Sequence, residues 1–68
     1  MAICYKKLWK LLIDKDMKKK DLQRLAGISA ASVTKLGKNE HVNTEIIEKI
    51  CLALGCDVGD MMEIAEDE

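Results

Sequence analysis

The chain has 68 residues and no proline, so we expect one small domain built from helices, with little room for a catalytic pocket. Its net charge of −1 combines a balance of +7 over residues 1–38 with a balance of −8 over residues 39–68, and such asymmetry indicates a surface that faces a polyanion. Three cysteines and one histidine give neither the spacing of a zinc site nor a disulfide framework, so we expect no metal, no cofactor and reduced thiols in the cytoplasm.

The first predicted helix covers residues 5–16, where leucines and Trp9 recur at helical spacing and lysines lie on or beside the other face. Ile3 and Tyr5 precede this stripe, and we expect them to form a short extended arm. Because Trp9 lies on the apolar stripe, its side chain is expected in the core or at an interface.

The next two predicted helices are joined by a tight turn. The first covers residues 19–26, and Leu25 is among the side chains expected to face inward. Gly27 follows, where a residue able to adopt positive φ ends a helix. Ser29 is a good N-cap for the next helix, over residues 30–38, because its hydroxyl accepts from free backbone N–H groups.

The fourth predicted helix covers residues 45–54 and has a broad apolar face. Thr44 is expected as its N-cap, and Gly55 is expected to end it. The core that these helices share is predicted to bury the following side chains: Leu8, Leu12, Leu22, Ala26, Val33, Leu36, Ile50 and Leu54.

A short fifth helix is predicted over residues 58–64, capped by Asp57. It presents Met61 and Met62, which suit a core and a dimer surface equally well. Residues 65–68, which are mostly acidic, are expected to fray.

The run from Met17 to Leu36 resembles the helix-turn-helix of the phage Cro and repressor family, also called the xenobiotic-response-element type. The stretch LxxLAGIS carries the resemblance, with Val four residues later and Leu seven residues later. CLALGCDVGDMME resembles the family's fourth helix and the start of its fifth, so the resemblance covers nearly the whole chain. The segments KLWKLLIDKDMKKKDL and KLGKNE resemble a compact subgroup, the VanU-type regulators of vancomycin-resistance operons. The resemblance implies an all-α, lambda-repressor-like domain of five helices over residues 1–68.

The resemblance also implies roles for eight residues. Four match positions that face DNA bases: Ala30, Ala31, Thr34 and Lys35. Four match positions that contact DNA phosphates: Lys19, Ser29, Lys38 and Asn39.

The sequence departs from the family at three of its positions. Family members often carry Gln or Arg where Ala30 and Ala31 stand, and many carry Glu where Gly37 stands. Alanine methyls can pack on thymine methyls but cannot hydrogen-bond a base edge. We therefore expect Lys35 and Thr34 to lead direct readout, with DNA shape supplying the rest.

From these features we predict a sequence-specific DNA-binding regulator that represses transcription as a homodimer on a two-fold operator. The dimer interface is expected to use Ile3 and Tyr5, or Met61 and Met62, because a domain this small cannot bury an apolar terminus at both ends. The alternative is a protein-interaction module, antitoxin-like or anti-repressor, that uses the acidic helices. Double-stranded DNA is the expected partner; catalysis, membrane insertion and a small-molecule ligand are not expected.

Overall fold

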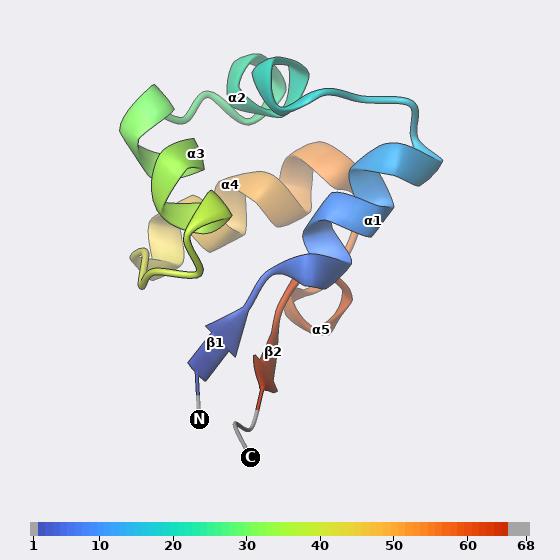
Figure 1. The fold of residues 1–68 in the computed structure, drawn as a ribbon. Coiled ribbons are helices and arrows are strands. Elements are labelled where there is room, and N and C mark those ends of the chain that lie inside the picture. The colour runs from blue at the N-terminus through green and yellow to red at the C-terminus, as the bar shows by residue number, and fades with distance from the viewer. Residues whose placement is uncertain (1, 66–68) are drawn as a thin grey trace.

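The computed structural model describes residues 2–65 and contains the five predicted helices together with two short strands. In Figure 1 helix α4 runs across the middle of the bundle, with α2 above it and α1 and α3 on either side. The two ends of the described chain lie close together, and residues 66–68 of the predicted acidic tail lie outside it. The elements are β1 (Ala2–Cys4), α1 (Lys6–Asp14), α2 (Lys19–Ala26), α3 (Ala30–Gly37), α4 (Thr44–Leu54), α5 (Val58–Met61) and β2 (Glu63–Ala65).

One apolar core joins all five helices. Of the predicted core residues only Ala26 differs, since it is half-buried at the edge of the cluster. Leu25, which was expected to face inward, is exposed. At about 100° per residue it lies on the far side of Leu22 from Ala26, and the inward face of α2 is centred between those two. The buried side chains are Tyr5, Leu8, Leu12, Leu22, Ile28, Val33, Leu36, Ile50, Leu54 and Met61.

The four longer helices all end in the same way. A residue with a left-handed backbone lies one or two positions after each helix, and the residue after it donates a backbone hydrogen bond back across the last turn. The left-handed residues are Asp16, Gly27, Asn39 and Gly55, with φ of 56°, 68°, 57° and 65°. The hydrogen bonds run from Met17 to Leu12, Ile28 to Gln23, Glu40 to Lys35 and Cys56 to Cys51, at 2.8, 3.1, 2.9 and 3.0 Å.

The two glycine endings were predicted and the other two were not. Asp16 ends α1 before its predicted limit, because a left-handed residue cannot continue a right-handed helix. The predicted N-cap Thr44 is also corrected: it is the first residue of α4, and the Asn43 side chain accepts from the backbone N–H of Ile46 at 3.0 Å. Asn and Thr are both good N-caps, so the sequence alone did not show which of the adjacent residues Asn43 and Thr44 caps the helix.

The predicted fifth helix is too long. It ends at Met61, Met62 is extended, and residues 63–65 form β2 instead. This strand pairs antiparallel with β1, with Ile3 opposite Ile64. The extended arm expected at Ile3 and Tyr5 is confirmed at Ile3 but not at Tyr5, which already turns into α1 with ψ of 23°. The partner of β1 lies about sixty residues away, and local periodicity does not reveal it. Within residues 2–65, no helix has the length and apolar character that crossing a bilayer requires.

Candidate nucleic-acid interface

The helix-turn-helix consists of α2, the turn at Gly27 and α3. A Cβ built at Gly27 meets nothing within 4 Å, so glycine is needed there for its positive φ and not for space. Ile28 then turns into the core, and the Ser29 hydroxyl caps α3 by accepting from the backbone N–H of Ser32 at 3.2 Å. The predicted cap and turn are both confirmed.

All four predicted base-facing residues are exposed on the outer face of α3, away from the buried Val33 and Leu36. The Thr34 hydroxyl donates to the backbone oxygen of Ala30 at 3.1 Å, so its proton is used inside the helix. Thr34 keeps an oxygen that accepts and a methyl group. Among the four residues, Lys35 is therefore the side chain that brings an N–H donor to this face.

The four predicted phosphate-contacting residues, Lys19, Ser29, Lys38 and Asn39, are also exposed. They come from the start of α2, the cap of α3 and the two residues after α3, which border the outer face of α3. Two of them already hold backbone groups. Ser29 caps its helix, and the Asn39 side-chain oxygen accepts from the N–H of Tyr5 at 3.2 Å.

The position of Lys19 depends on two other residues. Its ammonium lies 4.6 Å from the ring centre of Trp9 on α1, a cation–π distance. A Cβ added to Gly37, at the end of α3, would lie 3.6 Å from the same nitrogen. Trp9 is half-buried, and its ring packs against the Lys19 ammonium. Gly37 has no side chain that could cover Lys19. The sequence pattern did not reveal this pairing, because Trp9 and Lys19 belong to different helices.

Tyr5 joins the start of α1 to the loop after α3. Besides its N–H bond to Asn39, its hydroxyl donates to the backbone oxygen of Glu40 at 2.9 Å. The Tyr5 side chain is completely buried, and burial raises the pKa of its phenol above the ordinary value of 10.0. These bonds fix the loop that carries Lys38 and Asn39.

The charge of the helix-turn-helix is strongly positive. Between residues 18 and 38 the only acidic residue is Asp21. The basic residues there are Lys18, Lys19, Lys20, Arg24, Lys35 and Lys38. Lysines at a helix N-terminus oppose the helix dipole. Asp21 offsets that cost, because its carboxylate accepts from the backbone N–H of Lys18 at 2.9 Å in the first turn of α2.

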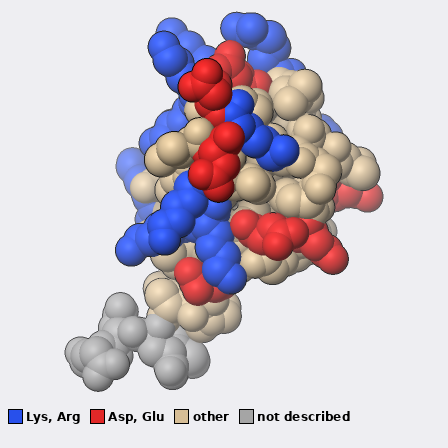
Figure 2. Space-filling view, turned by 90° about the vertical axis from the view of Figure 1, so that its right-hand side faces the viewer, with Lys and Arg blue, Asp and Glu red and all other residues tan. Residues whose placement is uncertain are grey.

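The lysines of α1 do not extend this basic surface uniformly. Figure 2 shows the side of the molecule turned away from α3, where Lys and Arg alternate with Asp and Glu. Lys7, Lys10 and Lys15 line a groove there together with Asp14 and Asp60. The positive half of the sequence is therefore not one positive face. The basic side chains that lie near α3 belong to the helix-turn-helix.

The predicted dimer residues separate into two kinds. Tyr5 and Met61 are completely buried within the single chain, so their side chains have no surface to offer a partner. Ile3 and Met62 are half-buried, and Ile64, opposite Ile3 in the strand pair, is 62% exposed.

Comparisons with known proteins agree with this geometry. The family model of the Cro/C1-type helix-turn-helix DNA-binding domain matches residues 7–67. The chain is similar to the crystal structure of the transcriptional regulator VanUg, with 50% sequence identity over 91% of this chain and 83% of that chain and a TM-score of 0.88. A search of curated protein sequences found no match.

Proposed function

The chain belongs to the Cro/C1-type helix-turn-helix DNA-binding family, and on this premise we propose that it is a sequence-specific transcriptional repressor acting as a homodimer on double-stranded DNA. Similarity to the transcriptional regulator VanUg supports a role as a DNA-binding regulator of transcription. The observation that carries the proposal is the exposed outer face of α3, bordered by Lys19 and Lys38 on an otherwise acidic protein.

In the proposed complex the N-terminus of α3 enters the major groove. Lys35 donates to acceptors on base edges, and Thr34 accepts or packs beside them. The methyl groups of Ala30 and Ala31 pack against thymine methyls. Small residues at the first turn of α3 also let the helix backbone approach the bases closely, so groove shape contributes to the choice of site.

Phosphate contacts come from Lys19, Ser29, Lys38 and Asn39 in this proposal. The Trp9 ring restrains Lys19, and the Tyr5 bonds restrain the loop of Lys38 and Asn39. Such contacts set the register of the protein on the duplex and supply most of the affinity for any sequence.

A homodimer places two α3 helices on half-sites about one DNA turn, roughly 34 Å, apart. We propose that the strand pair supplies the interface through Ile3 and Met62, with Ile64 beside them. Sedimentation of the protein alone and on operator DNA tests this. A single chain in both states would refute the dimer.

The binding face is tested by a matched pair of charge changes. Ala30→Asp puts a carboxylate on the outer face of α3 and should abolish binding to a duplex selected from a random library, with an unchanged circular dichroism spectrum. Glu63→Ala removes a charge from β2, outside the helix-turn-helix, and should change the affinity little. The reverse result, with Ala30→Asp binding normally and Glu63→Ala failing, would make the protein-interaction module the better interpretation.

Repression is tested by transcription from a promoter that overlaps the selected site. RNA output should fall as the protein is added and should stay unchanged with Ala30→Asp. A rise in output would identify an activator.

A further inference from the structure

Three sulfur atoms meet where α4 ends and α5 begins. The Cys51 thiol donates to the Met61 thioether, with 3.7 Å between the sulfurs, and the Cys56 side chain lies beside Cys51 across the turn. Met61 is completely buried, and both cysteines are half-buried. The three side chains come from the last turns of α4, the turn after Gly55 and α5.

The backbone accounts for the contact between the two cysteines. Across the left-handed Gly55, the N–H of Cys56 donates to the backbone oxygen of Cys51, and this helix ending brings the side chains of those two positions together. The same two positions in the helix-turn-helix are Gln23 and Ile28, which carry no sulfur. Met61 adds the third sulfur because α5 folds back onto α4.

A coordinating thiol loses its proton outright, so both cysteines can bind a metal ion as thiolates.

We propose that Cys51, Cys56 and Met61 form a three-sulfur binding site for copper(I). Two thiolates and a thioether are soft ligands, which copper(I) prefers. Zinc prefers four ligands, and in the described part of the chain no three His, Cys, Asp or Glu side chains gather into a metal cluster. On binding, each thiol releases its proton to water as its sulfur bonds the metal, and no atom changes oxidation state.

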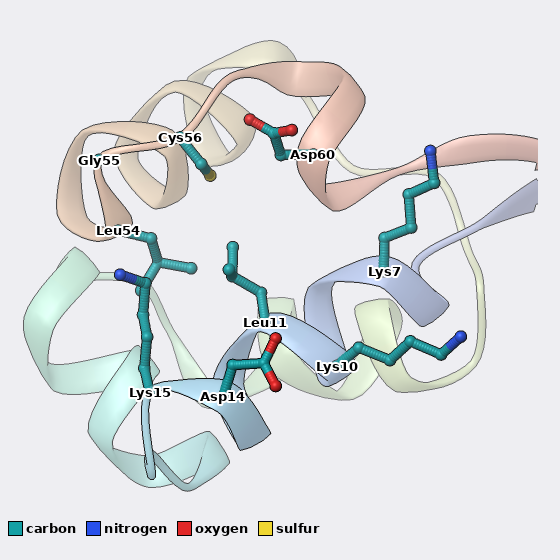
Figure 3. A pocket seen from close by; sticks show the side chains of 9 residues that line it. All are labelled: Lys7, Lys10, Leu11, Asp14, Lys15, Leu54, Gly55, Cys56 and Asp60. Carbon is teal, nitrogen blue, oxygen red and sulfur yellow. The ribbon is translucent and has the colours of Figure 1, made fainter.

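One of the three sulfurs, that of Cys56, has an open approach. Figure 3 shows the Cys56 sulfur pointing into the groove between α1 and the turn that joins α4 to α5. This groove has a volume of about 420 Å³ and is lined by Lys7, Lys10, Asp14 and Asp60 among others. The Lys7 ammonium donates to the backbone oxygen of Gly59 at 3.3 Å, so a positive charge lies beside α5.

The test is titration with copper(I) in anaerobic buffer containing ascorbate, in competition with a coloured copper(I) chelator. We expect one copper per chain, an ultraviolet thiolate–copper band and a higher melting temperature, because the ion joins α4 to α5. Cys51→Ser and Cys56→Ser should each abolish the complex. Met61→Leu keeps the core volume and should weaken binding by about tenfold or more.

Two matched controls separate ligands from bystanders. Cys4→Ser removes the third cysteine of the chain, and Met62→Leu changes the neighbouring methionine; both should bind copper like the parent. The proposal is overturned if the parent fails to take copper from the chelator, if both single serine variants at Cys51 and Cys56 still bind it, or if Met61→Leu binds as tightly as the parent. Circular dichroism confirms that each variant is folded, and none of these outcomes depends on DNA binding.

Discussion

The molecule contains the same backbone unit twice, with opposite surroundings. Helix α2 ends at left-handed Gly27 and α3 begins after Ile28 and the cap Ser29; helix α4 ends at left-handed Gly55 and α5 begins after Cys56 and the cap Asp57. Both glycines have open space where a Cβ would lie, and both turns close with the same backbone hydrogen bond. The helix–glycine–helix device by itself therefore does not define a nucleic-acid site.

The two units differ on the C-terminal side of the turn. The first unit continues into an eight-residue helix with a neutral cap, and the second into a four-residue helix that is capped by Asp57 and contains Asp60. An eight-residue helix extends about 12 Å and presents two turns to a groove, whereas four residues present one. Carboxylates at the second unit also repel phosphate. Helix length and cap charge therefore make one unit a DNA-binding candidate and leave the other to pack against α1 and carry the sulfur cluster.

The largest expected effect comes from breaking the core of the first unit. Leu36→Ala removes a completely buried side chain of α3 and should lower the free energy of unfolding by about 2–5 kcal/mol. Leu52→Ala on α4 is the matched control, because Leu52 is 77% exposed and its removal should cost little. Urea denaturation followed by circular dichroism measures both, and equal losses would contradict the assignment of these faces.

The next effect distinguishes base contacts from phosphate contacts within the first unit. Lys35→Ala should lose about 1–3 kcal/mol of binding free energy on the selected site and little on random DNA. Lys19→Ala should weaken both and reduce the salt slope by about 0.9 for one lost phosphate contact. Salt titrations with both duplexes are the measurement. A loss for Lys35→Ala that is the same on both duplexes would show that Lys35 contacts phosphate.

A third measurement tests whether the two turns are equivalent. Gly27→Ala and Gly55→Ala each force a side chain into the left-handed region without a clash, so each should cost about 1–2 kcal/mol. Thermal unfolding of the two variants checks this. A clearly larger loss at one glycine would mean that its turn carries strain or contacts that the other lacks.

The smallest effect concerns the bond that restrains the edge of the first unit. Tyr5→Phe removes the donor to Glu40 and should cost about 1 kcal/mol of stability. The pKa of Tyr5 is raised in the folded protein. Its contribution to the free energy of unfolding is therefore complete below pH 10 and is lost as the pH rises from 10 through the pKa of the folded state. Unfolding of parent and Tyr5→Phe across this range should show the extra alkaline loss in the parent alone. Equal curves would contradict it.

Much of this architecture could be predicted because its determinants are local. Gly27, Ser29 and Gly55 act within one turn of their own position, and the spacing of Leu8 with Leu12 marks a helix face directly. The left-handed Asp16 and Asn39 were not predicted, because a charged or amide residue in that conformation has no single sequence pattern.

The features that escaped prediction depend on contacts between distant segments. The β1–β2 pair joins the two ends of the chain, and Trp9 reaches Lys19 from another helix. Met61 suited a core and a dimer surface equally, and only the fold places it against Cys51. The roles of Ala30, Ala31, Thr34 and Lys35 toward DNA remain predictions, although their exposure on one helix face agrees with them.

The bonds of Tyr5 have a consequence for cooperativity. They connect the strand pair, where we propose that a second copy docks, to the loop of Lys38 and Asn39. A partner that immobilises β1 reduces the conformational freedom of that loop before DNA arrives, so less entropy is lost on binding. Thermodynamic reciprocity then requires DNA to strengthen the association of the two copies by the same factor.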